Sequence, residues 1–268
     1  MTPRQRCFAC LDTEPPRLLE AALWIAAEHE PGVRPQKYLD SVANLRQQVF
    51  AALPDQPAIE LAQPLLRRLC ELDYQEDNDE PLRPQSALLH RVLQRRRGQP
   101  LSLAILALDL ARQLEIPLQG VNFPGHFLLR VPGADHLLDP CTGRRLYPND
   151  CRALLYHHVG PALELNAEHL QPCDARQILQ RLSRNLRMLH VHAEDYPAAL
   201  KDAERVLEFG PPSSVDHLAR AEMYRLLDCP QAERYDLERA LLLSDDPAMQ
   251  AHLGKRLREN QARNSPLH

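Results

Sequence analysis

The chain has 268 residues, of which 44% are hydrophobic and 25% are charged, and these proportions are ordinary for a soluble globular protein with a sizeable core. Its net charge of −4 supplies no general basic field, so we expect no nucleic acid among its partners. No apolar run reaches the roughly 18 residues that a membrane-spanning helix needs, so we also expect no membrane contact.

Residues 1–16 are rich in proline and arginine, and we expect them to form a flexible tail. They carry positive charge but lack the apolar run of a secretory signal. Cys7 and Cys10 lie in this tail, but a zinc site would need two further ligands and no matching pair is evident. The seven cysteines of the chain are odd in number and scattered, which argues against a disulfide framework and favours a cytoplasmic location.

Three helices are predicted next, at 17–30, 36–53 and 58–71, because apolar residues recur there at helical spacing. Residues 71–80 then carry six carboxylates, which predicts a solvated loop. A Ca²⁺-binding loop is the alternative, although the spacing of the acids differs from that of an EF-hand.

A helix at 86–97 ends in three arginines followed by Gly98, as suits the carbonyl-rich end of a helix. Pro100 fits the first turn of the next helix, which covers about 100–114. That helix is apolar nearly all round, so we expect it to be buried.

Short strand-like runs follow, separated by Pro-Gly pairs and other turn residues, at 118–123, 126–131, 135–139 and 144–147. They suit a small antiparallel sheet packed on the 100–114 helix. Residues 149–170 are predicted to return to short helices. The fold class predicted for 17–172 is therefore α+β.

From Asp174, a plausible N-cap, the rest of the chain is predicted to form helical hairpins. A weak period of 34 residues relates His190, Ala198, Ala203 and Val206 to Tyr224, Ala232, Leu237 and Ala240. This is the period of tetratricopeptide repeats, which predicts an all-α region over 173–268 closed by a helix at about 247–260. A generic array of helical hairpins is the alternative.

His126 opens one predicted strand and Asp139 closes the next, so a hairpin would bring the two side chains together. A His beside a carboxylate suits acyl transfer, which also needs a nucleophile at a helix N-terminus. Ser102 is the only such group in the first turn of the 100–114 helix. The plainer interpretation makes His126 a strand-end residue, Asp139 a turn former, and Ser102 a hydroxyl bonded to the backbone.

Cys141 is the thiol nearest to Asp139 in the sequence, but it lies on a turn and not on the helix, so we expect it to be passive. The pairs His157/His158 and His190/His192 lack the i, i+4 spacing of helical metal ligands. We therefore expect no metal and no cofactor.

The segments Gly98-Gln-Pro-Leu-Ser-Leu-Ala104 and Gly120-Val-Asn-Phe-Pro-Gly-His-Phe-Leu-Leu-Arg130 resemble those of the bacterial SirB-type proteins. That family joins a transglutaminase-like domain to a C-terminal tetratricopeptide region, and the resemblance covers nearly the whole chain after residue 15. It implies a papain-like α+β core in which His126 matches the catalytic base and Asp139 the acid that orients it.

The cysteine of active transglutaminase-like enzymes has no counterpart here, because Pro100 to Ser102 occupy its place. Cys141-Thr-Gly143 and the acidic segment 71–80 also depart from the pattern of the family. We therefore expect a non-catalytic regulatory protein that binds a protein or peptide through its helical-repeat region. A groove near Asn122, Gly125 and Cys141, beside His126 and Asp139, would accompany that surface. The alternative is a hydrolase or acyl-transferase that uses Ser102, His126 and Asp139.

Overall fold

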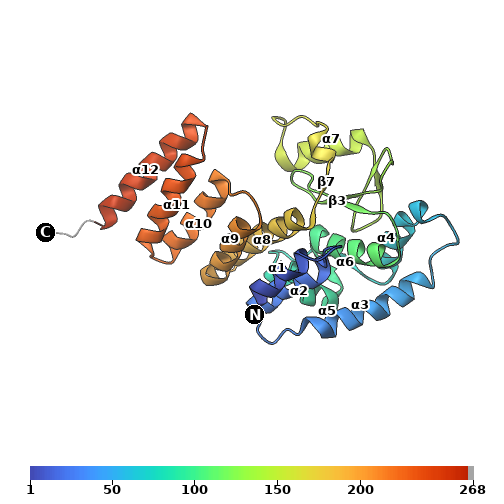
Figure 1. Ribbon diagram of the computed structural model, residues 1–268. Coiled ribbons are helices and arrows are strands. Elements are labelled where there is room, and N and C mark those ends of the chain that lie inside the picture. Colours follow the sequence, from blue (N-terminus) through green and yellow to red (C-terminus); the bar gives the residue numbers. More distant parts are fainter. Residues whose placement is uncertain (265–268) are drawn as a thin grey trace. The chain divides into compact units, whose positions relative to one another are not determined.

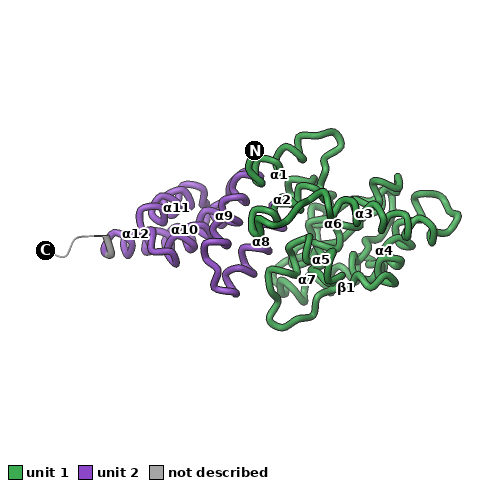
Figure 2. Tube along the Cα trace, turned by 90° about the horizontal axis from the view of Figure 1, so that it is seen from below, with its two compact units in different colours: residues 1–179 green, residues 180–268 purple. Residues whose placement is uncertain are grey.

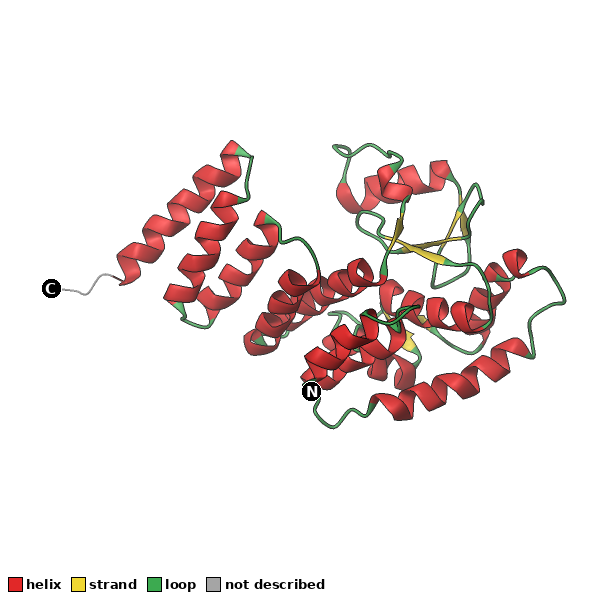
Figure 3. Ribbon diagram, in the orientation of Figure 1, coloured by secondary structure: helices red, strands yellow, loops and turns green. Residues whose placement is uncertain are grey.

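The computed structural model describes residues 1–264 and mixes α-helices with a small antiparallel sheet, which confirms the predicted α+β class (Figures 1 and 3). The chain divides into two compact units, Met1–Leu179 and Gln180–His268 (Figure 2). The division lies inside helix α8 (Ala175–His192), a few residues after the boundary at 172/173 that the sequence predicts. Within the described residues, no helix combines the length and the apolar character needed to cross a membrane.

Residues 1–16, expected to be a flexible tail, instead contain helix α1 (Pro3–Leu11). Its start is fixed by a capping box, in which the Thr2 hydroxyl accepts the Gln5 N–H and the Gln5 side chain accepts the Thr2 N–H. Cys7 and Cys10 are buried, and α1 packs on the next helix. The two cysteines therefore belong to the core, where burial raises the pKa of Cys10 to about 11.

The predicted helices of the first unit are present, with boundaries shifted by a few residues. They are α2 (Leu18–His29), α3 (Pro35–Phe50), the 3₁₀ turn η1 (Ala58–Glu60), α4 (Ala62–Glu71), the 3₁₀ turn η2 (Pro84–Ser86), α5 (Leu89–Arg95) and α6 (Pro100–Gln113). As predicted, α6 is almost wholly buried, with Pro100 at its first position. It contacts the helices α2 and α4 and the strand β4, so it forms the centre of this unit.

The acidic segment 71–80 is not simply solvated. Its residues Gln75–Glu76 form strand β1, which pairs in parallel with β2 (Arg97–Gly98). Asp77 is buried and accepts a hydrogen bond from Arg95 at 2.5 Å, and Asp73 pairs with Arg97 at 3.0 Å. The carboxylates and the arginine run therefore neutralise each other, a long-range pairing that the local sequence does not reveal.

The main sheet has the strand order β6-β5-β4-β3-β7, with every pair antiparallel. Its strands are β3 (Gln119–Val121), β4 (Leu128–Arg130), β5 (Leu137–Leu138), β6 (Arg145–Leu146) and β7 (Pro172–Cys173). Helix α7 (Pro148–Val159) and the 3₁₀ turn η3 (Glu168–Leu170) follow β6. One apolar cluster joins the sheet to α7, including Val121, Leu137 and Leu146 of the sheet and Cys151 and Leu155 of the helix.

The second unit is built from the remainder of α8 and from α9 (Tyr196–Phe209), α10 (Ser214–Leu226), α11 (Pro230–Leu242) and α12 (Pro247–Asn264). Helix α10 packs against both α9 and α11, and α11 packs against α12. Ala221, Leu237, Ala240 and Leu253 form a core cluster of three of these helices. The sequential packing agrees with the predicted helical hairpins.

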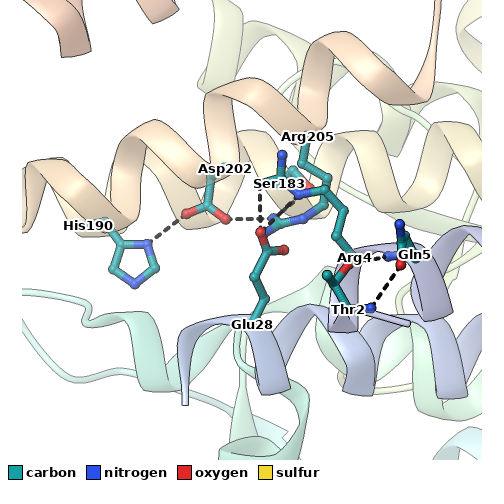
Figure 4. Close-up of polar contacts among 8 residues, drawn as sticks. All are labelled: Thr2, Arg4, Gln5, Glu28, Ser183, His190, Asp202 and Arg205. Atoms are coloured by element: carbon teal, nitrogen blue, oxygen red, sulfur yellow. Dashed lines mark hydrogen bonds and ion pairs between the residues drawn. The ribbon is translucent and has the colours of Figure 1, made fainter. Parts of the chain in front are cut away.

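A buried aspartate recurs in this unit at the predicted interval of 34 residues. Figure 4 shows Asp202 of α9 between His190 and Arg205, at 2.7 and 2.6 Å. Thirty-four residues later, Asp236 of α11 lies 2.8 Å from His217 and 2.7 Å from Arg220. Small residues indicate this period in the sequence, and the two aspartates follow the same spacing. The buried aspartate thus recurs after 34 residues, whereas its His and Arg partners come from different positions in the two cases.

Candidate functional site

The structure brings His126 and Asp139 together, as the hairpin prediction required. His126 precedes β4 and Asp139 follows β5, and these strands pair with Leu129 opposite Leu138. The His126 Nε2 atom lies 3.7 Å from Asp139 Oδ2, with the side chains 15% and 23% exposed. This distance allows an ion pair but exceeds the length of a hydrogen bond. The Nε2 atom is buried and has no hydrogen-bond partner among the described residues.

Helix α7 packs closely on the turn that presents His126. Gly125 has φ +73°, and a Cβ atom there would lie 2.4 Å from the Cβ of His158, so only glycine fits. The His126 and His158 rings stack at 5.6 Å, and the His157 ring meets His158 edge-on at 5.1 Å. Burial, together with the two neighbouring imidazoles, lowers the pKa of His158 below its ordinary value.

Asp139 is held by the turn that follows it. Its Oδ1 atom accepts the N–H groups of Cys141 at 2.8 Å and Thr142 at 2.9 Å and the Thr142 hydroxyl at 3.1 Å, while Oδ2 faces His126. Burial alone would raise the pKa of Asp139, but His126 and these N–H donors outweigh it, so the pKa lies below its ordinary value. Asp139 is therefore ionised at neutral pH.

Helix α4 clamps this turn at two points that the sequence did not indicate. Gln63 Nε2 donates to the Gly143 carbonyl at 2.8 Å, and Cys70 Sγ donates to the Cys141 carbonyl at 2.6 Å. Gly143 has φ +68°, and a Cβ atom there would lie 3.1 Å from Leu66 Cβ. These contacts join residues about 70 to 80 positions apart in the chain, so local sequence patterns cannot predict them.

Ser102, the candidate nucleophile, does not face a base. It is fully buried in the first turn of α6, where its hydroxyl lies 3.4 Å from the Ala87 carbonyl. Since the His126 Nε2 atom has no hydrogen-bond partner in the described chain, Ser102 does not bond to it. The geometry matches the plainer interpretation of a hydroxyl bonded to the backbone.

The thiols near Asp139 are held in the protonated form. Cys141 is buried, and burial together with the charge of Asp139 raises its pKa well above the ordinary range. Burial and Asp139 raise the pKa of Cys70 in the same way. A thiolate is the reactive form of cysteine, so both environments oppose nucleophilic attack.

The three residues expected to line a groove differ in how far they are exposed. Asn122 follows β3 and is half-buried, whereas Gly125 is exposed and packs against His158. Cys141 is buried, so it does not line an open surface. Three cavities of about 260, 280 and 450 Å³ lie instead around β5 and β6. Within either unit, the described residues contain no trio of His, Cys, Asp or Glu whose ligand atoms are close enough for a metal ion.

Comparison with known proteins identifies the family of this chain. The family model described as the transglutaminase-like superfamily matches residues 36–184. The chain belongs to the transglutaminase-like superfamily, and within it to the UPF0162 proteins, which include SirB1, so the SirB-type resemblance is confirmed.

Relatives extend over both units. A UPF0162 protein of Pseudomonas aeruginosa is 62% identical over 97% of this chain and 96% of its own length. A UPF0162 protein of Xylella fastidiosa is 32% identical over 91% of this chain and 89% of its own. SirB1 of Salmonella typhimurium is 28% identical, with 56% of each chain covered.

Proposed function

We propose that this protein is a non-catalytic member of the transglutaminase-like superfamily that acts as a cytoplasmic protein- or peptide-binding module. One observation carries the proposal. At the helix start where a reactive thiol would stand, Ser102 is fully buried and its hydroxyl is directed at the Ala87 carbonyl. We therefore infer that His126 and Asp139 have no nucleophile that they could activate.

The electrostatics of the site support the same conclusion. A general base must reach the proton that it removes, within about 2.6–3.2 Å or through one water. Cys70 directs its thiol at the Cys141 carbonyl, and the negative charge of Asp139 disfavours a thiolate at either cysteine. His126 and Asp139 are thus explained as parts of a packed turn.

The second unit supports the binding role. Large apolar side chains are exposed on its helices, among them Val215 of α10, Tyr235 of α11 and Leu242, which is 77% exposed. Stacked helical hairpins form extended surfaces suited to proteins and peptides. All seven cysteines are free, as suits a protein that works in a reducing compartment.

Covalent labelling tests the non-catalytic part. The full chain is incubated at pH 7.5 with a fluorophosphonate and with an acyl thioester, and intact mass followed by peptide mapping locates any adduct. We expect no adduct on Ser102, Cys70 or Cys141, and identical spectra for Ser102→Ala. An acyl adduct that disappears in Ser102→Ala and in His126→Gln would instead establish the hydrolase or acyl-transferase alternative.

Affinity capture tests the binding part. The full chain and a Tyr235→Ser/Leu242→Ser double variant are used as baits, with Val159→Ser as a matched control, since Val159 is an exposed apolar residue of the first unit. We expect a partner that the parent and the control retain and that the double variant loses. Equal recovery by all three baits would refute binding through this surface.

A further inference from the structure

The edge strand β6 offers an unused pair of backbone hydrogen-bonding groups. The Asp139 N–H donates to the Arg144 carbonyl at 2.9 Å, and Leu138 lies opposite Arg145. Because bonded and non-bonded pairs alternate in an antiparallel ladder, the Arg145 N–H and C=O point away from β5. β6 ends the sheet, and the described residues supply no hydrogen-bond partner to either group.

The backbone groups on both sides of Arg145 are already used. The Gly143 carbonyl accepts the Gln63 side chain, and the Tyr147 N–H donates to Asp150 Oδ2 at 3.0 Å. The open edge is therefore one residue long. Short edges of this kind protect a sheet against uncontrolled pairing, yet they leave room for a specific strand.

Two cavities lie at β5 and β6, each lined by one of the two alternating rows of side chains, and Ala134 and His136 of the turn between β4 and β5 line both. The α7-side cavity, of about 260 Å³, is lined by the cross-strand row Arg130, Leu137 and Leu146 together with Cys151 and Leu170. The α4-side cavity, of about 280 Å³, is lined by the alternate row Leu138 and Arg145 together with Gln63, Ala62 and Glu60. A single extended chain along β6 would reach both, because its successive side chains point to opposite faces.

The two faces differ in charge. The α4-side cavity shares Gln63 and Arg145 with a more open hollow of about 450 Å³, which Arg67 and Arg144 also line. Arg144 is paired with Asp150 at 2.6 Å, whereas Arg67 and Arg145 form no ion pair with the described residues. Glu60 lines the same cavity and the exposed Asp135 interacts electrostatically with Arg145, but neither carboxylate forms an ion pair with the two arginines, which favours an acid on this face.

The α7-side cavity is more apolar. Leucines from β5, from β6 and from the segment after α7 form its floor. Its polar groups are largely engaged, since Arg130 donates to the Leu170 carbonyl at 3.2 Å and His136 contacts Asp135 at 2.9 Å. This face suits an apolar side chain.

We propose that an extended acidic–apolar peptide segment of a partner protein adds to β6 as a sixth, antiparallel strand. A carboxylate residue lies opposite Arg145, exchanges two backbone hydrogen bonds with it and directs its side chain at Arg145 and Arg67. The residues before and after it direct apolar side chains into the α7-side cavity. Backbone bonds supply affinity and the two cavities supply specificity, as in other cases of strand addition. The site lies in the first unit and goes beyond the surface proposed above for the helical unit.

The test uses a fluorescein-labelled peptide, Gly-Ser-Leu-Glu-Val-Ser-Gly-amide, with the full-length protein. We expect saturable fluorescence anisotropy, together with slowed hydrogen exchange of the Arg145 amide measured by NMR. Methylation of the glutamate nitrogen removes the donor to the Arg145 carbonyl and should weaken binding about tenfold, the effect of one hydrogen bond. Methylation of the valine nitrogen, which points to solvent, is the matched control and should change affinity less than about twofold.

Protein variants provide the second arm. Arg145→Glu and Arg67→Glu should each weaken peptide binding at least about tenfold, whereas Arg34→Glu, an exposed arginine of the same unit that lines neither cavity, should not. Absence of saturable binding, equal binding of the two methylated peptides, or an unprotected Arg145 amide in the complex would each overturn the proposal. A dimer in sedimentation whose Arg145 amide is protected without peptide would overturn it in favour of pairing between two copies of this chain.

Discussion

Asp236 provides a direct test of the polar contact that recurs in the helical unit. Its carboxylate is completely buried and accepts three hydrogen bonds, one from His217 at 2.8 Å and two from Arg220 at 2.7 and 2.8 Å. Asp236→Ala would leave the Arg220 and His217 side chains, which are 19% and 10% exposed, without their acceptor. Removing one partner of a buried ion pair costs about 3–5 kcal/mol. Arg220 retains some access to water, so we expect about 3 kcal/mol.

The matched substitution Asp236→Asn keeps the volume and one acceptor oxygen, so its cost should fall to about 1–2 kcal/mol. Asp245→Ala serves as the control, because Asp245 is exposed and its change should stay within about 0.5 kcal/mol. Urea unfolding of the full chain is followed by circular dichroism at 222 nm. The single tryptophan, Trp24, reports the first unit separately by fluorescence. If Asp236→Ala unfolds at the same urea concentration as Asp245→Ala, the buried carboxylate does not stabilise the unit and our reasoning is wrong.

Three further predictions concern the first unit and the thiols of the chain. Gly125→Ala should destabilise the protein by at least about 1–2 kcal/mol in urea unfolding, because the left-handed backbone disfavours a side chain and the new methyl group meets His158. NMR titration should give His158 a pKa below about 6.5, and His126→Gln should raise it by removing one neighbouring charge. Since the folded pKa lies below the unfolded one, the unfolded state binds more protons, and the contribution of His158 to stability should fall as pH drops below about 6.5. At pH 8, Ellman's reagent should react with exposed Cys229 in the native protein and with Cys141 only after urea unfolding.

Local sequence patterns were sufficient to predict the helix and the hairpin that position the site. The nearly continuous apolar run predicts α6, and two short strand-like runs, one opened by His126 and the next closed by Asp139, predict the hairpin that brings these side chains together. Each of these features depends on residues close together in the sequence. The His–Asp pair was predicted because the chain folds back only once between them.

Features that depend on distant partners could not be predicted in this way. The acidic segment was expected to be solvated because its partners, Arg95 and Arg97, are about twenty residues away. The sequence does not predict helix α1, because its apolar face is only a few residues long and the helix gains its stability from packing on α2. The clamp of Gln63 and Cys70 on the Asp139 turn was missed for the same reason.

The burial of Ser102 limits what protein engineering could achieve at this site. Ser102→Cys would place a thiol at the start of α6. The sulfur would be buried next to the Ala87 carbonyl, where no substrate could reach it. Opening that position would require the segment from η2 to α5 to retreat from the start of α6, a rearrangement of many contacts. A single substitution at this position would therefore not expose a nucleophile, and doing so would need a redesigned segment between η2 and α5.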